Sequence, residues 1–239
     1  MKIHTFRTER NGFTLVETVI AIGILTVLLT GFLAVFGPAA RTIRKTLSID
    51  EASRLQDTLV LELTTLRDGE EINRYQGDTF LKAIDWIANS EEAGETILIY
   101  KYRALPGQQR PDGSLAPAGR QLGISNQDFI VEPQVRRVSD PLLAEDLQSL
   151  EGRVFFVKLR QMIFQQGGVQ RSERRGEIVD PYQPGIDFSN NPLAYPEAVV
   201  LFEAEYYSLP SATLTYLQTA FNPDNFNRPI FVRNLSVRR

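Results

Sequence analysis

An α+β fold is predicted for this chain of 239 residues, in which one long N-terminal helix packs on an antiparallel β-sheet. Three features of the sequence support the prediction. An apolar run of 24 residues lies near the N-terminus, and a segment with leucines at helical spacing follows it. Beyond residue 95, short segments rich in β-branched and aromatic residues alternate with turn-forming residues.

The apolar run spans Phe13–Phe36 and contains a single ionisable side chain, that of Glu17. A helix of this length rises about 36 Å, which is enough to cross a hydrocarbon core of about 30 Å. We therefore expect residues 13–37 to form a transmembrane helix.

The helix is predicted to continue as an amphipathic segment to about residue 67, where Asp68-Gly69 would end it. Its leucines fall on one stripe, which would dock on a globular head: Leu55, Leu59, Leu63 and Leu66. A second, short helix is predicted over Thr79–Asn89, because Phe80, Ile84 and Ile87 share one face.

The β-rich region begins at about residue 95. Its predicted strands are Thr96–Ala104, Asp128–Val138, Arg153–Phe164, Glu197–Ser208 and Pro229–Val237. In the third of these, Phe155, Val157 and Leu159 point to one side, and Lys158 points to the other. The stretches 105–120 and 167–196 are rich in Pro, Gly, Gln and Asn and are predicted to be surface loops.

Composition narrows the possible functions. The formal net charge is -3, which gives no basic face for neutralising phosphates, so we expect no nucleic-acid partner. The chain has no cysteine, which excludes disulfides and thiolate chemistry, and its one histidine is His4.

The order of the N-terminal signals is unusual. A Sec-type signal peptide places its cleavage site after the apolar stretch. Here a short basic leader ends in Gly12, and the apolar segment begins directly afterwards with Phe13-Thr14-Leu15-Val16-Glu17. This segment resembles the prepilin processing motif of type IV pilins and type II secretion pseudopilins.

The resemblance implies a specific maturation. A prepilin peptidase would cleave residues 1–12 as a leader, and Phe13 would become an N-methylphenylalanine. Residues 13–37 would form the transmembrane and filament-core helix, and residues 38–239 a soluble head with the pilin-like fold. The protein would cross the bacterial inner membrane once, with its C-terminal head in the periplasm, before it enters a pilus or pseudopilus.

The resemblance also implies a role for Glu17 in filament assembly, in which its carboxylate attracts the Phe13 amine of a neighbouring subunit. An ionised carboxylate inside a bilayer costs at least ~2.5–3.5 kcal/mol, so it needs a partner. The new amine has a reference pKa of about 7.7–8.0 and is mostly cationic at neutral pH. The alternative is that Glu17 lies near a helix end and reaches the lipid headgroups.

Cleavage after Gly12 would remove His4, so no His-based triad or zinc site could be built, and we expect no enzyme. Glu203 and Glu205 are predicted to lie on a solvated strand face. The loop 180–191 gathers oxygen-bearing side chains that could hold calcium, but its spacing matches no defined calcium loop. We therefore assign no metal or cofactor.

The sequence thus predicts a structural minor pilin or pseudopilin, of which the J-type pseudopilins are closest in length. Its expected partners are other pilin or pseudopilin subunits, the prepilin peptidase, the inner-membrane assembly machinery and the lipid bilayer. The alternative is a signal-anchored periplasmic binding or enzymatic domain with a pilin-like N-terminus. It would keep an uncleaved Met1 or be cut after the apolar stretch in the manner of a Sec-type signal peptide.

Overall fold

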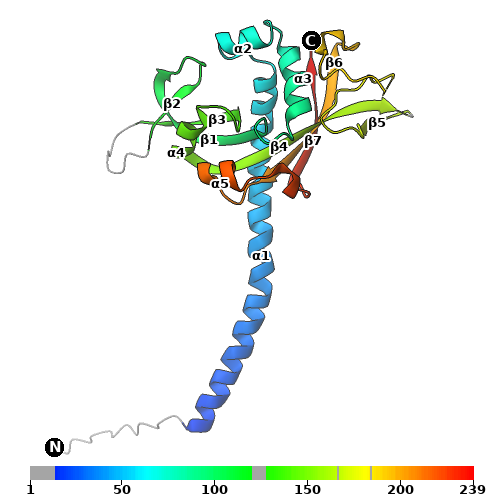
Figure 1. The fold of residues 1–239 in the computed structure, drawn as a ribbon. Coiled ribbons are helices and arrows are strands. Elements are labelled where there is room, and N and C mark those ends of the chain that lie inside the picture. Colours follow the sequence, from blue (N-terminus) through cyan, green and yellow to red (C-terminus); the bar gives the residue numbers. More distant parts are fainter. Residues whose placement is uncertain (1–13, 120–127, 166, 184) are drawn as a thin grey trace, which may run out of the picture. The chain divides into compact units, whose positions relative to one another are not determined.

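The computed structural model describes residues 14–119, 128–165, 167–183 and 185–239 (Figure 1). Gly12 and Phe13 lie outside the described residues. The chain divides into two compact units, Met1–Leu47 and Ser48–Arg239, which we call the N-terminal unit and the head unit and describe separately.

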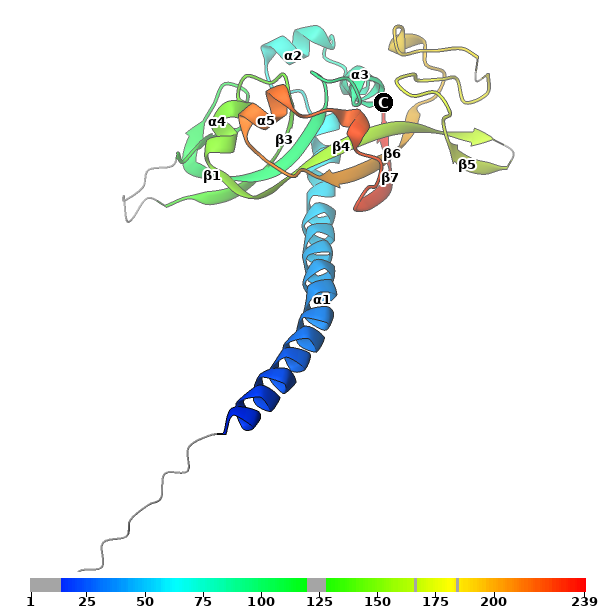
Figure 2. The same ribbon diagram turned by 60° about the horizontal axis from the view of Figure 1, so that its bottom comes forward.

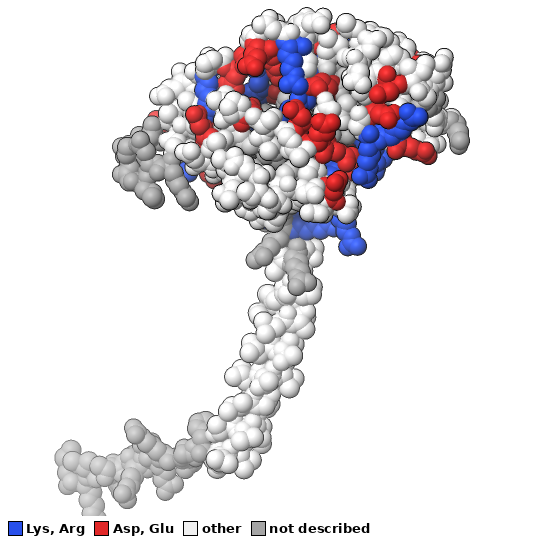
Figure 3. Space-filling model, viewed as in Figure 1, with Lys and Arg blue, Asp and Glu red and all other residues white. Residues whose placement is uncertain are grey.

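The described part of the N-terminal unit is helical. Helix α1 spans Leu15–Leu63 and passes through Pro38 without interruption. Within the N-terminal unit its apolar side chains are uncovered, with exposed fractions from 83% at Leu15 to 52% at Phe32. Figure 3 shows most of this length as uncharged surface. A helix that is apolar all round is typical of a membrane span.

The head unit contains the last turns of α1 and all the remaining elements. In chain order these are α2 (Gly69–Arg74), α3 (Thr79–Asn89), β1 (Ile97–Gln109), β2 (Leu115–Pro117), β3 (Ile130–Arg137), α4 (Leu143–Gln148), β4 (Leu150–Gln165), β5 (Gly168–Arg171), η1 (Pro192–Ala194), β6 (Val199–Ser208), α5 (Leu214–Thr219), η2 (Pro223–Asn225) and β7 (Phe231–Arg238).

The strands form one antiparallel sheet of seven strands in the order β2-β1-β4-β6-β7, with β3 also paired to β1 and β5 to β4. The predicted α+β class is confirmed, and each of the five predicted strands overlaps a strand of the sheet. Two short strands, β2 and β5, lie in stretches that the sequence predicted to be loops. β1 is also longer than predicted, because it continues into a hairpin with β2 whose turn contains Gly113 at a φ of 81°.

The core lies on both faces of this sheet. On one face, Leu55, Leu59 and Leu63 of α1 pack with α3 and with side chains of β4, among them Phe155 and Val157. The opposite face is covered by α4 and α5 over β1 and β4 (Figure 2). The alternation predicted for β4 accounts for this division, because Phe155 and Val157 belong to one cluster and Phe156 to the other.

Helix α1 ends at Leu63, so the expected end near residue 67 is wrong. Asp68 begins the next helix instead of ending this one. Its Oδ1 accepts a hydrogen bond of 2.8 Å from the N–H of Glu71, and it is therefore the N-cap of α2. An Asp-Gly pair can stand at the start or at the end of a helix. The hydrogen bond from Glu71 to the Asp68 side chain shows that this pair stands at the start of α2.

Two leucines of α1, one buried and one exposed, test the docking of this helix. Leu59 is fully buried, and Leu61 is 64% exposed. We expect Leu59→Ala to lower the free energy of unfolding by about 2–5 kcal/mol, because it leaves a cavity between α1 and the sheet. Leu61→Ala is the matched control and should change it by less than about 0.5 kcal/mol. Urea unfolding of the detergent-solubilised chain measures both, and equal effects would contradict this packing.

Candidate functional site

The first turn of α1 holds the predicted assembly residue Glu17 in a reciprocal pair with Thr14. A carboxylate oxygen of Glu17 accepts hydrogen bonds of 3.1 Å from both the backbone N–H and the hydroxyl of Thr14. The backbone N–H of Glu17 donates to the hydroxyl oxygen of Thr14 at 3.2 Å. This arrangement is a capping box, which supplies partners to backbone donors that the first turn of a helix otherwise leaves unpaired.

The capping box changes how Glu17 is understood. Within the described residues its carboxylate is bonded to neutral groups of its own chain and to no cation. The predicted partner, the amine of Phe13, lies outside the described residues. Sequence reasoning missed Thr14, although the pattern Thr14-Leu15-Val16-Glu17 is the sequence signature of a capping box.

Along the flank of α1 the other polar side chains are turned onto the helix. Thr18, Thr26 and Thr30 donate their hydroxyls to backbone carbonyls four residues earlier, at 2.8 to 3.2 Å. Polar groups in lipid need such internal partners. Among the described residues α1 is the one helix long and apolar enough to cross a membrane.

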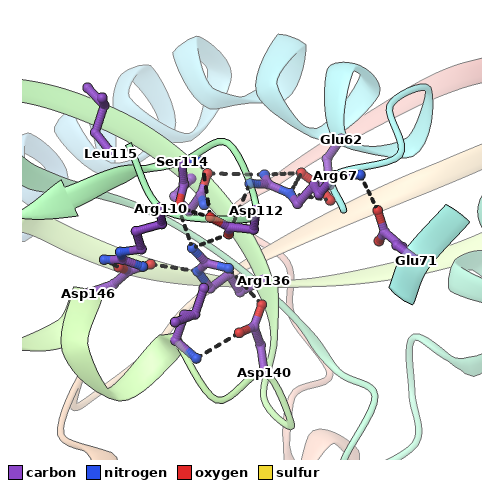
Figure 4. A network of polar contacts seen from close by, with 12 residues as sticks. Glu62, Arg67, Glu71, Arg110, Asp112, Ser114, Leu115, Arg136, Asp140 and Asp146 are labelled. Atoms are coloured by element: carbon purple, nitrogen blue, oxygen red, sulfur yellow. Dashed lines mark hydrogen bonds and ion pairs between the residues drawn. The ribbon is translucent and has the colours of Figure 1, made fainter. Parts of the chain in front are cut away.

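A second polar cluster lies inside the head unit and centres on Arg136 (Figure 4). The Arg136 side chain is 1% exposed, and three carboxylates surround it. Its Nε donates to Asp146 at 2.6 Å, and its two Nη atoms donate to Asp140 at 2.8 Å and Asp112 at 3.0 Å. Each of its nitrogens therefore has an acceptor.

Asp146 is fully buried and is the other centre of the cluster. Besides Arg136, it accepts hydrogen bonds of 2.6 Å from the hydroxyl of Tyr100 and 2.5 Å from Arg110. Burial by itself raises the pKa of Asp112, but hydrogen bonds from Ser114 and the charge of Arg136 outweigh burial and hold that pKa below its usual value.

The cluster extends to α1 through Glu62. This carboxylate is 3% exposed and pairs with Arg67 and with Lys82, whose Nζ lies 2.7 Å away. Lys82 is fully buried, also contacts Glu71 at 2.9 Å, and lies 5.0 Å from the centre of the Trp86 ring. Charged side chains thus link α1, α2 and α3.

A cavity of about 320 Å³ borders this polar cluster. Arginines supply much of its charged lining, and each of them is paired: Arg67 with Glu62, Arg74 and Arg137 with Asp85, and Arg136 with its three aspartates. Among the described residues there is no group of three or more His, Cys, Asp or Glu placed to hold a metal ion. The cluster is therefore a set of internal partners that orders the head unit.

The loop 180–191 directs its described carboxylates to its own backbone. Asp180 accepts hydrogen bonds from the N–H groups of Tyr182 and Gln183, and Asp187 accepts from those of Ile178 and Ser189. These bonds shape turns. Each of them uses the Oδ1 atom of its aspartate.

Glu203 and Glu205 were expected on a solvated face, and this expectation is wrong. Their side chains are 14% and 12% exposed, and both carboxylates pair with Arg171 on β5. The hairpin of β4 and β5, which the sequence did not predict, brings Arg171 over β6.

Comparison with known proteins supports the assignment of the N-terminal segment. A family model described as the prokaryotic N-terminal methylation motif matches residues 7–33. No curated protein and no solved structure matches the chain. The motif supports a type IV pilin-like protein that is processed as prepilins are, and together with the apolar α1 it is consistent with anchoring in the inner membrane.

The capping box predicts that Thr14 orders the first turn of α1. Thr14→Ala should speed amide hydrogen exchange at Glu17 by about fivefold, because a lost cap typically costs about 1 kcal/mol. Thr14→Ser keeps a hydroxyl at this position and should leave the exchange rate near that of the unaltered chain. The measurement is hydrogen exchange on the chain in lipid nanodiscs, and equal rates in both variants would show that the cap is not formed there.

The Arg136 cluster predicts a large loss of stability on removal of its central cation. Arg136→Leu should lower the free energy of unfolding by about 3–5 kcal/mol, because it leaves buried carboxylates without their main partner. The control is Arg54→Leu, which breaks an ion pair with Asp50 whose side chains are 73% and 60% exposed, and which should cost less than about 1 kcal/mol. Thermal or urea unfolding compares the two, and a small effect at Arg136 would contradict its central place.

Proposed function

We propose that this chain is a structural minor pilin or type II secretion pseudopilin. In this proposal a prepilin peptidase cleaves after Gly12 and Phe13 is N-methylated. The protein then spans the inner membrane once with its head in the periplasm. It finally joins other subunits in a pilus or pseudopilus, with the J-type pseudopilins as the nearest class by length.

One observation carries the proposal: an uncovered apolar helix begins within the methylation motif and holds a single carboxylate in its first turn. A water-soluble domain does not leave so much apolar surface exposed without a role for it. Lipid covers such a helix before assembly, and the helices of neighbouring subunits cover it afterwards. Small side chains along it, among them Ala21, Gly23 and Gly31, allow close approach of those helices.

The capping box suggests why the Glu17 carboxylate would bind a cation during assembly. Among the residues that the structure describes, the Glu17 carboxylate accepts hydrogen bonds only from the neutral donors of Thr14. A carboxylate in a medium of low dielectric gains more from a cation than from a neutral donor. The Phe13 amine of a neighbouring subunit therefore attracts Glu17, and the pair sets the axial register of the incoming helix.

Mass spectrometry of the N-terminus tests the processing step. In cells with an active prepilin peptidase we expect a mature chain that begins with N-methyl-Phe13. Gly12→Val should leave the leader attached, because a β-branched side chain occupies the position before the cut. Gly37→Ala is the control, since an added Cβ there meets nothing within 4 Å, and it should be processed normally. An intact Met1 in the unaltered chain would favour the alternative, a signal-anchored periplasmic domain.

The role of Glu17 has a separate test. Glu17→Ala should be inserted and cleaved as the unaltered chain is, and its incorporation into filaments should fall at least tenfold, because the cationic amine loses its partner. Filaments are sheared from cells, and the subunit is quantified in the sheared and membrane fractions. Glu51→Ala, on the head part of the same helix, is the matched control. Normal incorporation of the Glu17 variant would exclude the assembly role while leaving the processing result intact.

A further inference from the structure

Strand β7 lies at one end of the sheet and leaves an edge open. It pairs with β6 from Phe231 to Arg238, and no other described segment pairs with it (Figure 1). Most of its side chains are exposed, among them Arg233, Asn234 and Ser236. An open edge of this length offers unpaired backbone groups to another chain.

The register identifies the groups that face outwards. The N–H of Arg239 donates to the carbonyl of Ala198 at 2.8 Å, so Arg239 belongs to the hydrogen-bonded pairs of β6 and β7. These pairs alternate along an antiparallel ladder. The backbone groups of Phe231, Arg233, Leu235 and Val237 therefore face β6, and those of Val232, Asn234, Ser236 and Arg238 face the open edge.

The charge of this edge differs from that of the rest of the head unit. The segment 225–239 contains four arginines and no aspartate or glutamate. All four are exposed, and none forms an ion pair with a described residue: Arg228, Arg233, Arg238 and Arg239.

Elsewhere in the described head unit, every lysine and arginine except Arg153 pairs with a carboxylate. In the view of Figure 3, acidic and basic side chains accordingly lie beside one another. The unpaired positive charge of the head unit is therefore concentrated at β7.

Apolar side chains border the same edge. Asn234, Leu235 and Ser236 line the β7 side of a hollow of about 450 Å³, whose other lining residues are Val60 of α1, Met162 of β4, Val169 of β5 and Leu201 of β6. Side chains of an added strand alternate between the two faces of the sheet. A strand that combines acidic residues with small apolar ones would pair with the arginines and place apolar side chains in this hollow.

We propose that the open edge of β7 binds an extended, acidic segment of a partner protein, which adds to the sheet as a further strand. The outward N–H and C=O groups supply the backbone hydrogen bonds, and the four arginines select for negative charge. The proposal depends only on the head unit. It holds whether or not the leader is cleaved and the chain enters a filament.

Two other occupants are less well supported. A second copy of this chain would bring two arginine-rich edges together, and like charges at that distance repel. The arginines could also serve only to keep the edge unpaired, as charged residues do on many edge strands. That role requires no particular partner, and it predicts that acidic strands do not bind.

The first experiment uses the full chain in neutral lipid nanodiscs and a fluorescent eight-residue peptide of alternating Glu and Val, with the Lys and Val peptide as a control. We expect only the acidic peptide to bind, and to bind at least tenfold more weakly in 500 mM than in 50 mM salt. Absence of binding, or equal binding of both peptides, overturns the proposal.

Hydrogen exchange then locates the strand without any mutation. Binding of the acidic peptide should slow exchange at the amides of Val232, Asn234, Ser236 and Arg238. The amides of Arg233, Leu235 and Val237 are already bonded to β6 and should change little. Protection elsewhere, or protection without this alternation, would show that the peptide binds by charge alone.

Variants of the outward backbone positions and of the arginines complete the test. Ser236→Pro removes an outward N–H and should weaken peptide binding at least tenfold, because proline is tolerated on an edge but cannot donate. Ser236→Ala keeps the N–H and should bind as the unaltered chain does. Arg233→Gln combined with Arg238→Gln should weaken binding and flatten its salt dependence. Unchanged binding in Ser236→Pro, with an unchanged unfolding midpoint, overturns the proposal. If that variant does not fold, Asn234→Pro replaces it.

Discussion

Burial of one stripe of α1 against the sheet determines the arrangement of the head unit. Leu59 and Leu63 are fully buried in this contact, and Glu62 lies between them in the sequence and is buried with them. A buried carboxylate must be paired, and Lys82 and Arg67 supply its partners. Lys82 and Arg67 need further acceptors in turn. The polar cluster around Arg136 therefore depends on the burial of Glu62 within an otherwise apolar contact.

The same helix meets a different requirement before residue 47. There its large apolar side chains are exposed, and the hydroxyls of Thr18, Thr26 and Thr30 bond to carbonyls of the helix itself. One continuous helix therefore combines a surface suited to lipid with a stripe suited to a sheet. The helix continues through Pro38, although an interior proline removes one backbone hydrogen bond and crowds the preceding turn.

Local patterns in the sequence were sufficient for α1, apart from its end, for α3 and for the five longer strands, but they did not predict α2, α4 or α5. The period of the leucines predicted the docking face of α1, and the alternation in β4 predicted its one apolar face with Phe155, Val157 and Leu159, but the second core around Phe156 was not predicted. The polar cluster could not be predicted, because Glu62, Lys82 and Arg136 are far apart in the chain and no local pattern relates them. The ion pairs of Arg171 depend on a hairpin that a loop-like composition concealed. The cap at Thr14 was readable, since it needs only four consecutive residues.

The internal bonding of the threonine hydroxyls has a consequence for orientation. Because each hydroxyl of Thr18, Thr26 and Thr30 is turned onto the helix, the flank of α1 presents nearly the same surface in every direction. This part of the helix therefore offers an apolar surface on all sides. Glu17 is the exception near one end, and in the proposed assembly it would set the direction in which the helix faces a neighbour as well as its height.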